Sequence, residues 1–214
     1  MKSFVETSAN AAKEMLAGMP AKSETGNVIA HYELYKSVNH LDGCIVNCGI
    51  ASEDAFTSFA ILRSMMAPKK LIAFEKHTKN LYFDNTIMPY GSLCYETKPV
   101  DTSTSLIQLR LLQNNLATDH EFIPDYIADA IPQYLIENPE LKIAFLTINL
   151  DDYDATLTAL QFFFPRLVQD GKLVFENFYK QEEDYHAICD YFHYESIEIN
   201  NDFDNKGIHY VVKK

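Results

Sequence analysis

Long apolar runs and basic residues are both scarce in this sequence. No stretch of eighteen consecutive apolar residues occurs, so no membrane-spanning helix is expected. The N-terminal segment MKSFVETSANAAKEML has neither the continuous apolar core nor the small-residue cleavage pattern of a signal peptide. The 18 Lys and Arg are outnumbered by 30 Asp and Glu, and this formal net charge of −12 opposes binding to a phosphate backbone. We therefore expect a cytoplasmic protein that has neither a membrane nor a nucleic acid as partner.

Motifs for disulfides and structural zinc are missing as well. The cysteines form no C-x-x-C pair, and the seven histidines form neither H-E-x-x-H nor His-x-His. Cys44 and Cys48 lie close together on one predicted strand, while Cys94 and Cys189 stand apart. We expect reduced, buried thiols rather than a disulfide or a zinc site, which fits a reducing compartment.

Length and composition fit one domain. A chain of 214 residues can bury one full core, whereas two domains would be cramped. The apolar share of 47% is ordinary for a globular protein. We expect a single domain over residues 1–214, which begins with two helices within residues 1–40.

The stretch Leu141–Tyr179, LKIAFLTINLDDYDATLTALQFFFPRLVQDGKLVFENFY, is predicted to form a strand, a helix and a second strand. Lys142–Leu150 is a nearly continuous apolar run, typical of a parallel strand buried on both faces. A 3.6-residue apolar stripe through Leu157, Leu160, Phe164, Leu167 and Val168 predicts the helix. Asp170-Gly171 is predicted to end it. Lys172–Phe175 is then the second apolar strand.

Polar side chains follow both of these strands. Asn149 and Asp151 stand at the end of the first, and Glu176 and Asn177 at the end of the second. Because ligands of open parallel sheets collect at the carboxyl ends of the strands, the four side chains are predicted to reach one rim. The helix between the strands is expected to be capped by Asp152 or Asp154.

An earlier part of the chain has the same form. Cys44–Cys48 is a short apolar strand, Gly49 turns the chain, and a helix follows with Ser52 as its N-cap. Such a unit points backbone N–H groups at a ligand and commonly opens a cofactor-binding half-sheet. Leu71–Phe74 is the next strand, and Glu75 at its end is where ribose hydroxyls are usually bound in this architecture.

The last strands predict the fold class. Ser196–Asn200 and Gly207–Val212 read as two strands joined by a short polar turn, which predicts an antiparallel hairpin at one edge. Helices are predicted over 105–115, 126–137 and 182–192, with a short strand at 120–123. We predict an α/β, Rossmann-like class I methyltransferase three-layer sandwich, mostly parallel with this antiparallel C-terminal edge hairpin and an N-terminal helical extension.

The segment Lys76–Thr104 lacks clear periodicity and contains Pro89, Gly91 and Pro99. A long irregular stretch in a compact domain favours a lid or an acceptor-binding insert over residues 76–104, with disorder as the alternative. Either core packing or a homo-oligomer surface is expected of Phe162, Phe163, Phe164, Tyr191 and Phe192.

From about His31 to the C-terminus, the chain resembles a divergent member of the macrocin O-methyltransferase (TylF-type) family of class I S-adenosylmethionine-dependent methyltransferases. HYELYKSVNHLDGCIVNCG is similar to the family's helix, its G-x-I-V-E-x-G strand and its cofactor loop. YLIENPELKIAFLTINLDDYDATLTAL resembles its L-H-I-D-x-D-x-Y-x-x-T segment, and FFFPRLVQDGKLVFENFY its P-R-L-x-x-G-G-x-x-x-x-D-D-Y segment. The ending GIHYVVKK is similar to its last strand.

The resemblance implies methyl transfer from S-adenosylmethionine to a hydroxyl of a sugar or another small natural-product acceptor, with Mg²⁺ as a further cofactor. Together with the strand ends, it predicts cofactor-binding residues at Asn47, Gly49, Ile50, Glu53, Glu75 and Asp125. It implies metal ligands at Asn149, Asp151, Glu176 and Asn177. Catalytic roles are implied for Asp151 and Glu176.

Several of these positions depart from the family's pattern. Asn47 replaces an acid of the first strand, and Glu53 replaces a loop glycine, where its carboxylate opposes that of the cofactor. Asn149 replaces the first aspartate, and Glu176-Asn177 replaces the D-D pair. These joint changes favour a second hypothesis, a methyltransferase-like binding or partner protein that has lost catalysis.

Overall fold

The computed structural model describes residues 22–50, 52–66, 69–84, 92–99, 104–116, 120–176, 182–192, 198–201 and 208–214. The predicted N-terminal helix within residues 1–21 lies outside these residues, as does Asn177. None of the helices in these ranges is long and apolar enough to cross a membrane.

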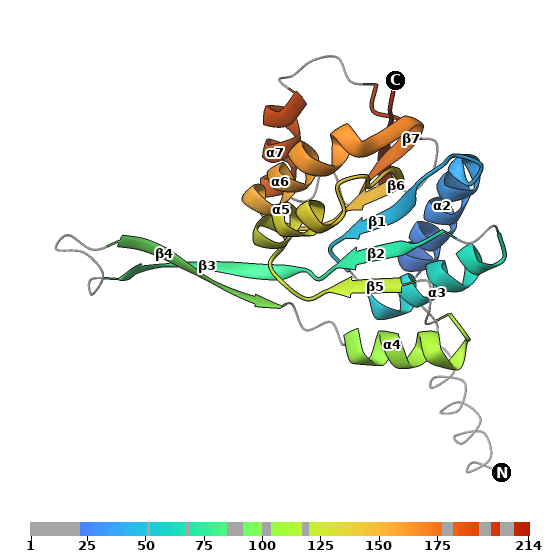
Figure 1. The fold of residues 1–214 in the computed structure, drawn as a ribbon, viewed down its shortest axis with the longest axis horizontal. Helices are drawn as coiled ribbons and strands as arrows, with labels where there is room; N and C mark the ends of the chain where they lie inside the picture. Colours follow the sequence, from blue (N-terminus) through green and yellow to red (C-terminus); the bar gives the residue numbers. More distant parts are fainter. Residues whose placement is uncertain are drawn as a thin grey trace, which may run out of the picture.

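A six-stranded sheet forms the middle layer (Figure 1). Its strand order is β5-β2-β1-β6-β7-β8, and all neighbours are parallel except β8, which runs antiparallel to β7. The strands are β1 Cys44–Cys48, β2 Leu71–Phe74, β5 His120–Ile123, β6 Ile143–Ile148, β7 Leu167–Glu176 and β8 Ile208–Val212. The predicted α/β, Rossmann-like architecture with a mostly parallel sheet is thereby confirmed.

Helices cover both faces of this sheet (Figure 1). One layer consists of α2 Lys22–Val38, α3 Glu53–Ser64 and α4 Thr104–Gln113, and the other of α5 Ile127–Glu137, α6 Tyr153–Phe163 and α7 Glu182–Phe192. Neighbouring strand residues point to opposite faces, so Ile45 packs in the cluster with α2 and α3 while Val46 packs in the cluster with α5 and α6. This double burial explains why the central strands are apolar at nearly every position.

Side-chain caps begin the two helices that follow β1 and β6. The Ser52 hydroxyl accepts a hydrogen bond from the Ala55 N–H at 3.3 Å, and an Asp152 carboxylate oxygen accepts one from the Ala155 N–H at 2.8 Å. Both caps were predicted, and the structure selects Asp152 over Asp154, which lies in the first turn of α6.

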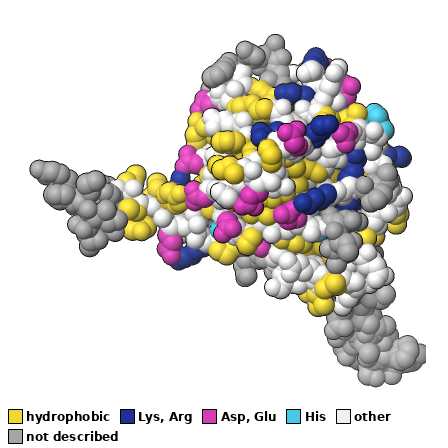
Figure 2. Space-filling view, in the orientation of Figure 1, with side chains coloured by type: hydrophobic (Ala, Val, Ile, Leu, Met, Phe, Trp, Pro, Cys, Tyr) yellow, Lys and Arg dark blue, Asp and Glu magenta, His cyan; other side chains and the backbone are white. Residues whose placement is uncertain are grey.

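The described residues of the segment predicted to be irregular, 76–84 and 92–99, instead form mainly two paired β-strands. Strands β3 His77–Asp84 and β4 Ser92–Pro99 form a separate two-stranded antiparallel sheet, the arm, which projects away from the body in Figure 1. The prediction of irregular structure was wrong because both faces of the outer arm meet solvent, so its strands need no apolar alternation. Exposed apolar side chains nevertheless lie along it, including Leu81 at 63% and Leu93 at 64% (Figure 2).

Two boundaries also differ from prediction. Helix α6 ends at Phe163, and a 3-10 turn over Phe164–Arg166 leads directly into β7, so Leu167 and Val168 belong to a strand and not to the helix. Pro165 explains the early end, because it has no N–H to continue the helical ladder. Of the described residues in the predicted strand Ser196–Asn200, Asn200 pairs with Tyr210 as an isolated bridge.

The thiols of β1 are buried, as predicted. Cys44 and Cys48 are free and buried, and burial raises the pKa of Cys44 to about 11, which leaves it an inert thiol at neutral pH. Cys94 on the arm and Cys189 on α7 are also free but only partly buried, so the prediction of burial does not hold for them.

Candidate functional site

A glycine turn joins the carboxyl ends of β1 and β6. Gly49 has φ +88°, and a Cβ placed there would lie 2.1 Å from the carbonyl oxygen of Asn149. The two strand ends are held together by the hydrogen bond from the Asn149 N–H to the Cys48 carbonyl at 2.9 Å. Glycine is therefore required both by the left-handed backbone and by the close approach of the neighbouring strand.

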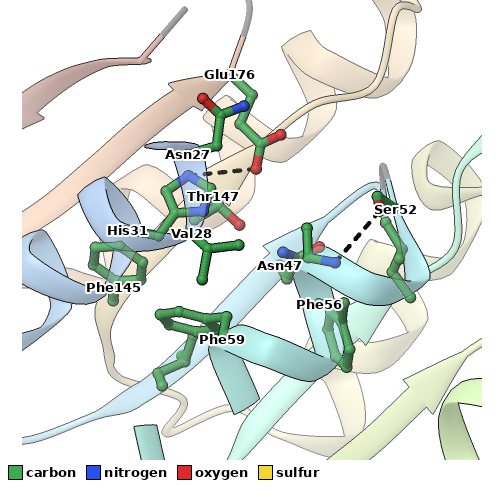
Figure 3. Close-up of a pocket in the computed structure, with 13 residues that line it drawn as sticks. Asn27, Val28, His31, Asn47, Ser52, Phe56, Phe59, Phe145, Thr147 and Glu176 are labelled. Carbon is green, nitrogen blue, oxygen red and sulfur yellow. Dashed lines mark hydrogen bonds and ion pairs between the residues drawn. The ribbon is translucent and has the colours of Figure 1, made fainter. Parts of the chain in front are cut away.

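A cavity of about 200 Å³ lies next to this turn, between α2, α3 and the sheet (Figure 3). Its apolar wall includes Phe56 and Phe59 of α3 and Phe145 of β6. Its polar groups come from α2, β1, β6, β7 and the N-cap of α3. The cavity is lined by Asn27, Val28, His31, Ile45, Asn47, Ile50, Ser52, Ala55, Phe56, Phe59, Phe145, Thr147 and Glu176.

Glu176 is the acidic side chain of the cavity, and neutral groups surround it. One of its oxygens, Oε2, accepts a hydrogen bond from Asn149 Nδ2 at 2.9 Å. The other, Oε1, lies 3.3 Å from His31 Nε2 (Figure 3). Burial lowers the pKa of His31, and the Glu176 carboxylate offsets this only in part, so the imidazole is neutral at pH 7. The Glu176 carboxylate therefore faces two uncharged partners.

Two further polar atoms in the cavity have no hydrogen-bond partner. Asn47 Oδ1 and Thr147 Oγ1 are both buried and unpaired, and Thr147 is only 4% exposed. Buried polar atoms are almost always paired in folded proteins, and an unpaired one indicates a missing ligand or water. The cavity therefore suits a group that donates hydrogen bonds from a partly apolar molecule.

The predicted cofactor residues do not all meet at this cavity. Asn47 and Ile50 line it, whereas Glu53 lies half-buried in the first turn of α3. Glu75 follows β2 and accepts a hydrogen bond from the Thr104 hydroxyl at the start of α4. Asp125 lies apart, exposed in a groove beside α5.

Asp151 lines a second depression, of which Glu176 is not a part. Its backbone has φ +55°, and its carboxylate forms an ion pair with Lys76, whose side chain is only 13% exposed. Lys79 and Asp154, each three residues further along the sequence, form a second ion pair. These pairs lie in a groove of about 860 Å³ between the base of the arm and the start of α6.

The four predicted metal ligands are consequently divided. Asn149 and Glu176 meet at the cavity, Asp151 is held in the groove, and Asn177 lies outside the described residues. Within the described ranges, no three His, Cys, Asp or Glu residues are grouped so that they could hold a metal. An ammonium beside Asp151 repels a cation and an amide N–H₂ cannot ligate one, so the donors present do not fit Mg²⁺.

Sequence reasoning missed three residues of this edge as site residues. His31 reaches the cavity from α2 and Thr147 from β6. No local sequence pattern indicates that either residue lines a site. Lys76 had one available signal, because the spacing of Lys76 and Lys79 matches that of Asp151 and Asp154. Only the fold shows that the two pairs face each other.

Comparison with solved structures gives the same fold. The calicheamicin methyltransferase CalS11 matches with a TM-score of 0.73 and 17% identity over 94% of this chain and 85% of its own. An O-methyltransferase from Bacillus cereus in complex with SAH matches with a TM-score of 0.59 and 14% identity, over 97% and 88%. An rRNA methylase from Streptococcus thermophilus matches with a TM-score of 0.52 and 16% identity, over 86% and 93%.

The sequence itself matches no protein-family model and no curated protein. At identities this low, the structural likeness shows a shared methyltransferase fold and not a shared substrate. The assignment to the TylF-type family, which the motifs suggested, stays a prediction.

Proposed function

We propose that the protein is an S-adenosylmethionine-dependent O-methyltransferase acting on a hydroxyl of a sugar or another small natural-product acceptor. The observation that carries the proposal is the carboxyl edge of the sheet, where the Gly49 turn, Glu75 and the cavity occupy successive strand ends of a methyltransferase fold. Ligands of such sheets bind at this edge. The SAH complex of the Bacillus cereus neighbour supports the choice of cofactor.

Within this proposal each side chain has a separate task. The Glu75 carboxylate accepts hydrogen bonds from the ribose hydroxyls, as its bond from Thr104 shows it can do from a hydroxyl. Asn47 and Thr147 supply unpaired polar atoms to the polar end of the cofactor or acceptor. When bound, S-adenosylmethionine would supply the methyl group, and the buried Glu176 carboxylate would accept the proton of an acceptor hydroxyl that reaches the cavity.

The groove beside the arm is the proposed site for the part of the acceptor that lies outside the cavity, away from the hydroxyl that reacts beside Glu176. It presents Lys76, Lys79 and Asp152 together with Tyr153, a mixture of donors, acceptors and an aromatic face that suits a hydroxyl-rich molecule. The sugar-type acceptor is supported by CalS11, described as a TDP-rhamnose 3'-O-methyltransferase. The arm then acts as the acceptor-binding insert that the sequence predicted over residues 76–104.

The decisive experiment is calorimetric titration with S-adenosylmethionine and S-adenosylhomocysteine. Micromolar binding is expected for the wild type, and Glu75→Gln should weaken it at least about tenfold, because a ribose hydrogen bond to a charged group is worth about 1.5–3 kcal/mol. Glu140→Gln, an exposed acid at the opposite end of the sheet, is the matched control and should bind normally. Absence of binding for both ligands at millimolar concentration would refute the proposal.

A second function, cofactor binding without catalysis, is favoured by Glu53 in the first turn of α3 and by the ion pair that engages Asp151. It predicts tight S-adenosylhomocysteine binding but no release of S-adenosylhomocysteine from S-adenosylmethionine when a panel of sugars and nucleotide sugars is offered. Turnover with any acceptor of the panel decides for the enzyme. Self-association, also predicted from the sequence, is a separate property that sedimentation would measure.

A further inference from the structure

We infer that the carboxyl edge of the sheet works without a divalent cation. The Lys76 ammonium takes the place of a metal ion beside Asp151, and the Asn149 amide takes the place of a carboxylate ligand beside Glu176. The consequence for catalysis rests on the proposed function. The statement about metal binding does not, and it can be tested alone.

The first observation is the orientation of Asn149. A carboxylate has only acceptor atoms, so the 2.9 Å contact with Glu176 Oε2 fixes the Asn149 amide with its N–H₂ group toward the carboxylate. Asn149 is only 3% exposed, which leaves the amide no solvent-facing alternative. The amide therefore donates a hydrogen bond to Glu176 Oε2 and turns no oxygen toward an ion at that point.

The second observation is the other side of Glu176. His31 Nε2 lies 3.3 Å from Oε1, and the imidazole is held by α2 against the ring of Phe145 at 6.5 Å between centroids. Both carboxylate oxygens thus have nitrogen neighbours on packed side chains. Mg²⁺ prefers oxygen ligands in octahedral geometry and releases its waters reluctantly, so this setting is unfavourable for it.

The third observation is Lys76. Its ammonium pairs with Asp151, and its side chain is largely buried between the base of the arm and the start of α6. The positive charge of Lys76, held next to the predicted ligand Asp151, repels a divalent ion far more strongly in a partly buried site than in water. Since Lys76 immediately precedes β3, the ammonium is delivered by the same connection that carries the arm.

Charge counting leads to the same conclusion. Of the four positions predicted as ligands, two carry carboxylates, Asp151 and Glu176, and two carry neutral amides. Lys76 pairs with Asp151, so among these four positions the carboxylate of Glu176 is the one formal negative charge that no Lys offsets. That charge suits one proton or one organic cation rather than Mg²⁺.

Manganese binding tests this directly. Mn²⁺ replaces Mg²⁺ at oxygen sites and its free form is measured by electron paramagnetic resonance. The wild type should show no site tighter than about 1 mM at moderate salt, which screens diffuse attraction by the acidic surface. The double variant Lys76→Met with Asn149→Asp should bind Mn²⁺ at least tenfold more tightly, and adding Asp151→Asn should abolish the gain.

The controls separate this inference from the proposed function. Lys79→Met with Asn80→Asp makes the same change of charge on the arm and should create no site, which excludes a general charge effect. A wild-type Mn²⁺ site that Asp151→Asn or Glu176→Gln removes would overturn the inference, and so would a folded double variant without any gain. Titration with S-adenosylhomocysteine, with and without EDTA, is the second test. Unchanged binding supports the inference, and loss of binding with EDTA refutes it. Absence of binding under both conditions refutes only the proposed function.

Discussion

The cavity and the arm lie beside the same edge of the sheet, yet their polar groups are held in opposite ways. In the cavity, Glu176 is buried against an amide and an imidazole, and the backbone beside it tolerates only glycine. At the arm, Lys79 and Asp154 meet in an ion pair whose acid is more than half exposed. Buried hydrogen bonds to charge are costly to break, whereas exposed ion pairs contribute little.

The difference extends to the elements themselves. The central strands are hydrogen-bonded on both sides and covered on both faces, but the arm is an isolated two-stranded sheet, which is marginal in water on its own. Contacts with the body hold it, including the Tyr95 hydroxyl, which donates to Asp129 of α5 at 3.1 Å. A fixed edge thus carries the chemistry of the proposed enzyme, while a lightly held arm is free to vary with the acceptor.

The largest effect is expected at the glycine turn. Gly49→Val places a side chain into the Asn149 carbonyl in a left-handed backbone, and should lower the free energy of unfolding by about 3 kcal/mol or more. Cys94→Val on β4 enlarges a partly exposed arm residue and should change it by less than about 0.5 kcal/mol. Urea denaturation measures both, and equal losses would erase the contrast between edge and arm.

The next effect is expected at the amide that holds Glu176. Asn149→Ala removes a buried hydrogen bond to a charged group and should cost about 2 kcal/mol. Asn80→Ala, the same change on the exposed face of β3, should be nearly neutral. Thermal unfolding of the pair at one protein concentration would show it, and a loss at Asn80 as large as that at Asn149 would contradict the account.

A pH-dependent effect is expected where α7 meets the edge. Burial raises the pKa of Asp184, although the Thr156 hydroxyl at 2.5 Å opposes the shift in part. The native state then holds this proton to higher pH than the unfolded state does, so the contribution of Asp184 to stability falls as pH rises from its ordinary pKa of 3.8 to its raised value. The unfolding free energy of wild type minus that of Asp184→Asn should decrease from about pH 4 to pH 7. A difference that increases over this range would contradict a raised pKa of Asp184.

The smallest effect is expected on the outer arm. Leu81→Ser with Leu93→Ser removes exposed apolar surface and should leave the unfolding free energy within about 0.5 kcal/mol of wild type. Leu146→Ala in β6 is the buried counterpart and should cost about 2–5 kcal/mol. A large loss in the arm variant, seen by urea denaturation, would mean that the arm is packed in solution and not exposed.

The sequence predicted the regular parts of the fold well, because burial on both faces leaves a clear record. The apolar runs at β1, β2 and β6 and the caps at Ser52 and Asp152 followed from local pattern. The last strand was predicted to pair with Ser196–Asn200, but it runs antiparallel to β7 and bridges the described part of that segment only at Asn200. The arm was missed because exposed strands carry no such record, and the end of α6 was misplaced because its apolar stripe continues into β7.

By itself the sequence determined which residues stand at the carboxyl ends of the strands, since strand ends are set by where apolar runs stop. It brought Asn149 and Glu176 to one edge correctly. The tertiary structure alone decided their partners: packing of α2 brings His31 to Glu176, and the connection into the arm brings Lys76 to Asp151. The physical reason is that hydrogen bonds and ion pairs depend on side-chain directions within a few ångströms, which are fixed by contacts between segments far apart in the chain.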